Sequence, residues 1–486
     1  MPGGCPDVFI RDRETGTTER VSVDSAGNQA NDQSGWPALS ADGRYVAYSS
    51  DASDLVPEDN NDVRDVFVHD RQIGTTERVS VDSAGNQGNW HSADPAISGE
   101  GRFVAFDSGA SSLVVGDTNG VSDIFVHDRQ TGATQRVSVD SAGNQGNWHS
   151  ADPAISSDGR YVAFESLASN LVPGDTNGVY DVFLHDRQTG ATQRVSVDSA
   201  GNQGSAHGLD PAISGDGRYV VFHSSSNLVP GDTNGLTDVF VHDWETAVTE
   251  RVSVDSAGNQ ANNSSSDPAA IGADGRYIAF VSRASNLVPG DTNGAYDVFL
   301  HDRQTGITER VSVDSAGNQG SAHSRNPAIS ASGRYVGFQS YSSNLVPEDT
   351  NGYWDAFLCD VGDSDGDGEW DAFDPCPTNP DCDSDSFSDS VERYLGTDPL
   401  DACPDFPGTP GLCPGLSCDG DDAWPLDLNI DTYVTVVGDV LNFRGRIGAT
   451  PGAPNWWQRL DFNADGLISV VGDVLMYRGM IGETCT

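Results

Sequence analysis

The nonapeptide VSVDSAGNQ at residues 137–145 is one of six identical copies in the chain. Successive copies start 58, 58, 58, 57 and 59 residues apart, so the period is almost constant. A fixed period of this length indicates an array of similar supersecondary units, each packed against its neighbours. The copies begin at Val21, Val79, Val137, Val195, Val252 and Val311.

Each unit contains four short apolar stretches, and the third copy shows them clearly. They are PAIS at 153–156, RYVAFES at 160–166, DVFLHD at 181–186 and RVSVD at 194–198. The first two flank S-D-G, a tight hairpin signal because glycine adopts positive φ at no steric cost. The stretch D-R-Q-T-G at 186–190 predicts a second hairpin, between the third and fourth strands.

The apolar pattern distinguishes the inner strands from the outer one. The run YVAF is continuous, as expected of a strand covered on both faces. RVSVD alternates, as expected of an edge strand with one wetter face. Four antiparallel strands in each period are typical of a propeller blade. The sequence therefore predicts an all-β, six-bladed β-propeller of four-stranded antiparallel blades.

The motif P-A-I-S-x-D-G-R-Y-V-A-F followed by D-V-F-V-H-D resembles the repeat of TolB-type propellers, from about Asp7 to Asp360. The resemblance implies six blades within residues 1–360. Strands one, two and four occur six times but strand three occurs seven times. We therefore expect five continuous blades, a sixth blade split between the two ends, and one surplus third strand. Third-strand copies begin at Asp7, Asp65, Asp123, Asp181, Asp238, Asp297 and Asp355.

The charge of the chain limits its partners. Acidic residues outnumber basic residues 73 to 26, and the net charge is −47. Nucleic acid and anionic membrane surfaces attract basic proteins, so both are excluded as partners. A cation is the natural partner. No apolar run of about 18 residues occurs, so no membrane span is expected.

Seven of the eight cysteines lie at or after Cys359, in a region rich in Asp. This distribution predicts disulfides and an oxidising compartment, and zinc is less favoured because no C-x-x-C pair occurs. We expect Cys5 and Cys359 to pair, because they lie beside the outermost third-strand copies. The first residues already belong to the repeat, so the expected extracellular or cell-surface location in a bacterium requires a leader outside this sequence.

Residues 361–403 contain two stretches with the spacing of calcium-binding loops, DSDGDGEWDAFD and DCDSDSFSDSVE. So many acids at this spacing repel one another unless a cation lies between them. The stretches and their cysteines resemble thrombospondin type-3 repeats, which implies calcium; a solvated acidic linker is the alternative. The expected ligands are Asp363, Asp365, Asp367, Glu369, Asp371 and Asp374, then Asp381, Asp383, Asp385, Phe387, Asp389 and Glu392, with Glu369 and Phe387 using their carbonyls.

Residues 404–424 are rich in Pro, Gly and Cys and predict a linker, and a second duplication follows in residues 425–486. Its halves, each a polar loop before an apolar V-V-G-D-V-L stretch, resemble a dockerin module. That resemblance implies paired calcium loops, short helices and a protein partner. The pattern departs from a calcium loop at Gly438 and Gly472, where position 12 lacks an acid. The expected ligands are Asp427, Asn429, Asp431, Thr435 and Asp439, then Asp461, Asn463, Asp465, Ser469 and Asp473.

Loops that start strand one and loops that join strands two and three share one face of a propeller, where binding residues usually gather. Six-fold geometry brings the residues just before each strand-one proline to the channel mouth. There they could bind a metal or a polar ligand; capping of their own turns is the alternative. The candidates are His91, His149, His207, His323 and Gln33, together with Asp94, Asp152, Asp210 and Asp267.

Two further sets of residues leave alternatives open. The third-strand histidines of the F-V-H-D motif are expected to hydrogen-bond between blades. The D-T-N-G-x-x-D loops offer three side-chain oxygens, which suits either weak calcium binding or a plain turn. These loops begin at Asp117, Asp175, Asp232, Asp291 and Asp349.

No motif of a known catalytic type occurs in the chain. The pattern is therefore more typical of a secreted, calcium-binding β-propeller that acts as a binding or scaffold module than of an enzyme. A protein or polysaccharide ligand is expected at the propeller face. The alternative is a secreted metal-dependent polysaccharide lyase or hydrolase that uses the channel mouth.

Overall fold

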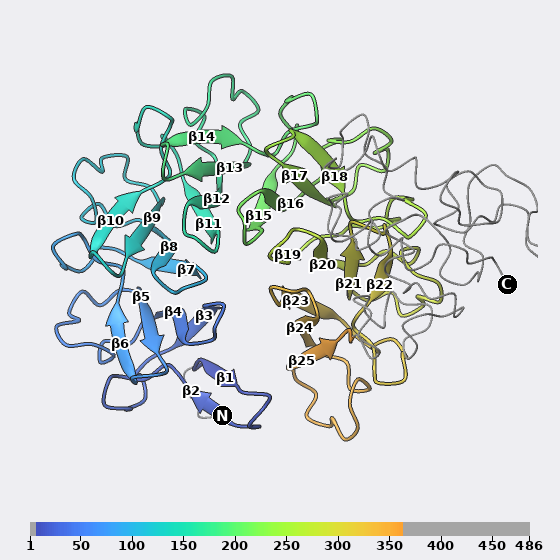
Figure 1. The fold of residues 1–486 in the computed structure, drawn as a ribbon, viewed down its shortest axis with the longest axis horizontal. Coiled ribbons are helices and arrows are strands. Elements are labelled where there is room, and N and C mark those ends of the chain that lie inside the picture. Colours follow the sequence, from blue (N-terminus) through green and yellow to red (C-terminus); the bar gives the residue numbers. More distant parts are fainter. Residues whose placement is uncertain (1–5, 363–486) are drawn as a thin grey trace, which may run out of the picture. The chain divides into compact units, whose positions relative to one another are not determined.

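The computed structural model describes residues 6–362, which form blades arranged around one axis (Figure 1). The regions predicted at 361–403, 404–424 and 425–486, with their calcium loops and short helices, lie outside the described residues apart from Val361 and Gly362. The part of the chain from residue 6 to residue 362 contains strands and turns but no helix, and so no helix that could cross a membrane.

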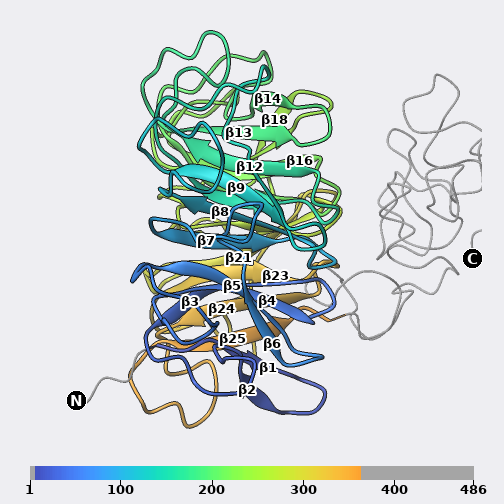
Figure 2. The ribbon, with the colours of Figure 1, turned by 90° about the vertical axis from the view of Figure 1, so that its left-hand side faces the viewer.

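The prediction of an all-β, six-bladed propeller is confirmed. Neighbouring strands in each sheet pair antiparallel and follow in sequence order, and Figure 2 shows them running across the ring from one face to the other. Blade I is β3 (Ser34–Leu39), β4 (Tyr45–Ser50), β5 (Asp65–Asp70) and β6 (Thr75–Arg78). Blade II is β7 (Ser92–Ile97), β8 (Phe103–Ser108), β9 (Asp123–Asp128) and β10 (Ala133–Arg136). Blade III is β11 (Ser150–Ile155), β12 (Tyr161–Ser166), β13 (Asp181–Asp186) and β14 (Ala191–Arg194).

The remaining sheets differ in their number of strands. Blades IV and V have four strands, blade VI has three, and a two-stranded sheet, here called the terminal hairpin, precedes blade I. Blade IV is β15 (Gly208–Ile213), β16 (Tyr219–Ser224), β17 (Asp238–Asp243) and β18 (Val248–Arg251), and blade V is β19 (Ala270–Ile271), β20 (Tyr277–Ser282), β21 (Asp297–Asp302) and β22 (Thr308–Arg310). Blade VI is β23 (Ser324–Ile329), β24 (Tyr335–Ser340) and β25 (Asp355–Asp360), and the terminal hairpin is β1 (Phe9–Arg11) and β2 (Thr18–Arg20).

The core consists of aromatic pairs on strands two and three. In blade III, Phe164 and Phe183 face each other in register with ring centroids 5.9 Å apart. All six residues of β13 are buried, whereas β14 alternates between exposed and buried positions. The prediction that the inner strands are covered on both faces is therefore confirmed, but RVSVD is not the alternating edge strand that was predicted. Only Arg194 of this stretch belongs to β14, and Val195, Ser196 and Val197 are all buried. Burial of such rings stabilises the blade by the hydrophobic effect and by ring stacking.

The turn between strands one and two also joins neighbouring blades. Gly159 has φ 73°, and a Cβ at this position would overlap the Phe103 ring of blade II. Glycine is therefore required here both by the turn and by the close approach of the next blade. The backbone N–H of Ser157 in the same turn donates to the Gly215 carbonyl of blade IV, at 2.9 Å.

The expectation that the third-strand histidines hydrogen-bond between blades was wrong for the histidine itself. His127 Nδ1 lies 2.9 Å from Thr134 Oγ1 in its own blade, and that hydroxyl donates to the Val81 carbonyl, which follows blade I. Because the threonine hydrogen is used for Val81, His127 Nδ1 carries a hydrogen and donates it. The threonine makes the link between blades. The same arrangement occurs at His69, His127, His185, His242 and His301.

The two ends of the described chain do not share one sheet, so the predicted split blade is also wrong. Within residues 6–362, β25 pairs with β24 and β1 pairs with β2. Arg13 of the terminal hairpin lies 4.4 Å from the Tyr335 ring centroid of blade VI. This contact matches Arg129 of blade II over Tyr45 of blade I, at 4.2 Å. The hairpin therefore acts as a half-blade between blades VI and I, and both outermost copies of strand three are used.

Cys359 lies on β25, at the position where other blades have the buried histidine. Its thiol forms no disulfide among the described residues. Cys5, its expected partner, lies outside them, so that pairing stays a prediction.

Candidate functional site

In each blade the residue directly before the strand-one proline has a strained backbone. φ is 46° at Asp94, 49° at Asp152 and Asp210, and 84° at Asp267. The left-handed region is uncommon for residues other than glycine, and such strain is concentrated at functional sites. In five blades the strand register shifts at this point, which re-aims the side chain as a β-bulge does. The six residues are Trp36, Asp94, Asp152, Asp210, Asp267 and Asn326.

These strand starts converge on a pocket of about 250 Å³ at the mouth of the channel. Trp36, Asp94, Asp152 and Asp210 line it, together with the prolines that follow them. The structure therefore brings three of the four predicted aspartates into one pocket. Asp267 stands nearby, because its charge acts on the same histidine as that of Asp210.

A second ring of side chains reaches the mouth from the fifth residue of strand two. The residues on either side change little between blades, as in Y-V-A-F-x-S, but the fifth residue differs in every blade. It pairs in register with the residue just before the strained aspartate, for example Glu165 with Ala151. The six residues are Ser49, Asp107, Glu165, His223, Val281 and Gln339.

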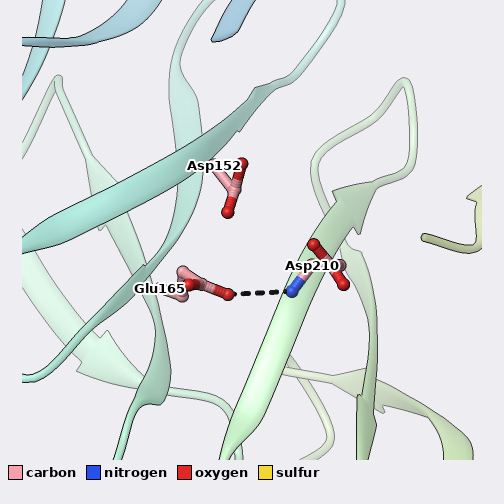
Figure 3. A group of neighbouring side chains, drawn as sticks. All are labelled: Asp152, Glu165 and Asp210. Atoms are coloured by element: carbon pink, nitrogen blue, oxygen red, sulfur yellow. Dashed lines mark hydrogen bonds between the residues drawn. The ribbon is translucent and has the colours of Figure 1, made fainter. Parts of the chain in front are cut away.

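Three carboxylates from both rings form a cluster, here called the mouth cluster (Figure 3). Asp152, Glu165 and Asp210 each offer one oxygen, and these oxygens lie within 4.8 Å of one another. Glu165 Oε2 accepts a hydrogen bond from the backbone N–H of Asp210 at 3.0 Å. Oxygen atoms from three carboxylates are the ligand type that hard divalent cations prefer.

Two carboxyl groups of the mouth cluster, those of Asp152 and Glu165, are only partly ionised at neutral pH. Burial, together with the charges of Asp94 and Asp210, raises the pKa of Asp152 to about 7. Burial also raises the pKa of Glu165 to about 7, and the charges of Asp152 and Asp210 add to the effect. Each carboxylate therefore destabilises the ionised form of the others, and a cation bound here would lower both pKa values.

Basic groups lie at the edges of this acidic region. His223 Nδ1 is 3.4 Å from Asp210 Oδ2, but burial lowers the pKa of the imidazole. On one side Arg64 pairs with Asp51 at 2.8 Å, and on the other Arg325 lies 3.7 Å from Asp267. Within residues 6–362 no arginine forms an ion pair with Asp152 or Glu165. The centre of the acidic region is thus left for a positively charged group.

The four candidate histidines are not among the residues that line the pocket at the channel mouth. His149 Nδ1 accepts the backbone N–H of Ser122, in the preceding blade, at 3.2 Å. The same bond recurs at His91, His207 and His323, with distances of 3.0, 2.9 and 3.0 Å. Gln33 instead donates to Asp51 at 2.6 Å. The histidines therefore join blades through Nδ1, and their role in ligand binding stays a prediction.

The D-T-N-G-x-x-D loops contain a basic side chain where calcium would have to lie. In blade II, Arg136 Nη1 is 3.3 Å from both Asp117 and Asp123, and Asn119 donates to Asp123 at 2.9 Å. The loops of blades III, IV and V have the same arginine, 3.4 to 3.6 Å from the first aspartate. These four loops are therefore ion-paired turns. Asp349 belongs to blade VI, which has no fourth strand among the described residues.

The strand-two residues Asp107, Glu165 and His223 were missed by the sequence analysis. The candidates predicted from the sequence were residues that recur in several blades, such as the histidine before strand one. Asp107, Glu165 and His223 stand out because their position differs from blade to blade. The signal was present in the sequence as a single variable position inside an otherwise repeated strand. Only the register between strands one and two shows that this position faces the mouth.

No protein-family profile and no curated protein matches the chain. Several solved structures share its fold at low identity. A protein assigned as TolB from Agrobacterium tumefaciens is 18% identical over 63% of this chain and 89% of its own, with a TM-score of 0.38. An oligogalacturonate lyase in complex with manganese is 13% identical over 74% and 83%, with a TM-score of 0.45. The propeller domain of the trilobed protease from Pyrococcus furiosus is 12% identical over 68% and 83%, with a TM-score of 0.41.

Proposed function

We propose that the chain is a secreted or cell-surface binding module that holds a positively charged group of its ligand at the mouth cluster. One observation supports this most strongly. The strand-two side chains that differ between otherwise similar blades lie on one face of the ring, here called the variable face, and three aspartates line the pocket at its centre. A protein partner and a polysaccharide partner both remain within this proposal.

Strain and charge both support a ligand at this place. Six strained residues are held around one axis, and strain of this kind persists where the surroundings impose it. Glu165 is buried and Asp152 is half-buried, and neither has an arginine partner in the described part of the chain, at a cost in folding free energy. A ligand that supplies the missing positive charge would recover that cost as binding free energy.

The test compares two variants that each replace three carboxyl side chains by amides. The mouth variant is Asp152→Asn/Glu165→Gln/Asp210→Asn, and the control is Glu14→Gln/Glu100→Gln/Glu245→Gln, in turns on the opposite face. Calorimetry of the full chain would use Mn²⁺, an oligolysine peptide and a chitosan oligomer as probes. We expect at least one probe to bind the mouth variant about tenfold more weakly than the control, about 1.4 kcal/mol. Equal binding by both variants, or no binding by the unmodified chain, would contradict the proposal.

The alternative function, a metal-dependent polysaccharide lyase or hydrolase, is favoured by one observation. The channel mouth carries different groups in different blades, namely Asp107, Glu165 and His223, and catalysis needs distinct groups for distinct roles. A carboxyl group with a pKa of about 7, as at Glu165, is suited to act as a general acid. Cleavage of a polysaccharide that is lost in Glu165→Gln would support this alternative and overturn the binding module.

We also propose, from the sequence alone, that residues 361–486 bind calcium and attach the propeller to a protein partner. Extracellular calcium loops often bind at roughly 0.1–1 mM, and binding then contributes to folding free energy. Scanning calorimetry of the full chain in 5 mM EDTA and in about 5 mM calcium would test this. We expect a calcium-dependent transition in addition to that of the propeller, and identical scans would contradict the proposal.

A further inference from the structure

A second pocket opens on the variable face, within blade II and against the start of blade III. Its volume is about 460 Å³. Trp90, His91, Asp107, Ser122 and His149 supply its side chains. Ala93, Gly109, Gly120 and Val121 complete its wall. We call it the blade II pocket.

The indole of Trp90 forms a flat apolar surface in this pocket. Trp90 is 58% exposed, although tryptophan is highly buried on average. A Cβ on Gly109 would stand 2.8 Å from Trp90 Cδ1, so glycine is needed for the indole to lie where it does. At the position of Gly109 the other blades have Asp51, Leu167, Ser225, Arg283 and Tyr341.

Only blade II combines these two residues. Blade III has a tryptophan at the equivalent position, Trp148, but Leu167 in place of Gly109. The remaining blades have no tryptophan there; their residues are Asp32, Ala206, Asn263 and Ala322. Blade III is therefore a natural control for blade II within the same chain.

Asp107 supplies an acceptor that the protein leaves unused. Its Oδ2 accepts the Ser122 hydroxyl at 3.0 Å, while Oδ1 is buried and has no hydrogen-bond partner in the described part of the chain. A buried acceptor without a partner destabilises the fold. Rotation of the Asp107 side chain toward the pocket would bring this oxygen to a hydroxyl group of a ligand.

The two histidines supply the complementary donors. His91 Nδ1 accepts the backbone N–H of Arg64 at 3.0 Å, and His149 Nδ1 accepts that of Ser122 at 3.2 Å. Because Nδ1 accepts, a neutral imidazole carries its hydrogen on Nε2. Each ring therefore offers one N–H donor in addition to the bond that holds it in place.

We propose that the blade II pocket binds one pyranose unit of an uncharged oligosaccharide. The C–H face of the sugar ring packs on Trp90, one hydroxyl donates to Asp107 Oδ1, and other hydroxyls accept from His91 and His149 Nε2. A flat apolar surface beside both acceptors and donors matches a sugar ring, which is apolar on its faces and polar around its edge. The proposal rests on the proposed function in one respect, because it takes the variable face as the ligand surface.

The acidic residues of the variable face disfavour the binding of an acidic sugar. Burial raises the pKa of Asp107 to about 6, and the charge of nearby Asp94 adds to the effect. A uronate would bring a further carboxylate to this site, and like charges at close range are unfavourable. We therefore expect neutral oligosaccharides to bind and oligogalacturonate not to bind.

The experiment measures binding of the full chain to cellohexaose, xylohexaose, mannohexaose and hexagalacturonate by calorimetry. Trp90→Ala removes the apolar surface, and Gly109→Leu fills the pocket with the residue that blade III already tolerates. The matched control is Trp148→Ala. We expect at least one neutral sugar to bind, a loss of about tenfold or more in both blade II variants, and a change within about twofold in the control.

Three results would overturn the proposal: no neutral sugar binds, Trp90→Ala and Gly109→Leu bind as the unmodified chain does, or hexagalacturonate binds more tightly than every neutral sugar. The proposed function is tested separately by the mouth variant. If the positively charged probes bind and the sugars do not, the sugar pocket is wrong and the binding module stands. If the sugars bind but the mouth variant behaves as its control, the sugar pocket stands. The proposed role of the mouth cluster in holding a positively charged group is then wrong.

Discussion

The two faces of the propeller are built from the same six repeats, but they differ in how far the copies agree. The uniform face carries the turns between strands one and two and between strands three and four, with A-D-G-R-Y and D-R-Q-T-G repeated with few changes. The variable face carries the strand-one starts and the ends of strand two, where one position differs in all six blades. The sequences of the six copies are therefore most alike where every blade makes the same contacts.

Contacts explain why the uniform face has little freedom. Arg102 of blade II pairs with Asp128 at 2.7 Å, and Arg129 lies over Tyr45 of blade I. Similar ion pairs and arginine contacts occur in most other blades, so a change in one copy would disturb a junction. On the variable face, by contrast, Val281 and Glu165 occupy the same strand position in different blades, and the blade forms with either.

The largest expected effect is on the scaffold. Phe164→Ala removes a fully buried ring that packs on Phe183, so we expect the free energy of unfolding to fall by about 3–5 kcal/mol. The control Trp148→Ala, at a residue that is 52% exposed, should change it by less than about 0.5 kcal/mol. Urea unfolding followed by circular dichroism measures both. Equal losses would remove the distinction between scaffold and variable face.

The next effect concerns acid stability. Burial lowers the pKa of His185, His242 and His301 to about 4, below the usual 6.5. The unfolded chain therefore binds more protons between pH 6.5 and 4, so stability is lost as the pH falls through this range, on the order of 1–3 kcal/mol for each histidine. His185→Asn keeps an N–H donor that cannot be protonated further, and should make the loss less steep. A slope as steep in His185→Asn as in the unmodified chain would contradict this assignment.

Asp152 and Glu165 of the mouth cluster should change the pH dependence of stability in the opposite direction to the buried histidines. Asp152 and Glu165 have folded pKa values of about 7, above their unfolded values near 4. The folded chain therefore binds more protons between pH 4 and 7, and these groups reduce stability as the pH rises through that window. We expect Asp152→Asn/Glu165→Gln to be more stable than the unmodified chain at pH 8, on the order of 1–3 kcal/mol, and similar to it at pH 4. A variant less stable at pH 8 would show that the carboxylates support the fold.

The sequence predicted much of the fold because each repeat contains clear turn signals between its apolar stretches. The glycines of the S-D-G turns and the continuous apolar run YVAF predicted the strands and their burial. Closure of the ring was not predictable from the pattern. Two outermost copies of strand three, at Asp7 and Asp355, compete for one place, and only packing of Arg13 against Tyr335 shows that both are used.

The candidate site was predicted in part. Asp94, Asp152 and Asp210 precede strand-one prolines, and this position alone indicated the channel mouth. The histidines were drawn into the same prediction because they lie three residues earlier, but their Nδ1 atoms are held by the neighbouring blade. Glu165 lies far from Asp210 in the sequence, and their contact depends on the register of two strands and the packing of two blades.

The most direct test of the central claim makes the variable face uniform. Asp107→Val/Glu165→Val/His223→Val gives blades II, III and IV the residue that blade V already has at Val281. The account predicts a melting temperature equal to or above that of the unmodified chain, since buried polar groups are removed, and binding of the mouth probes and neutral sugars weakened about tenfold or more. A variant that melts at a lower temperature but binds every probe as before would contradict it, because these residues would then belong to the scaffold.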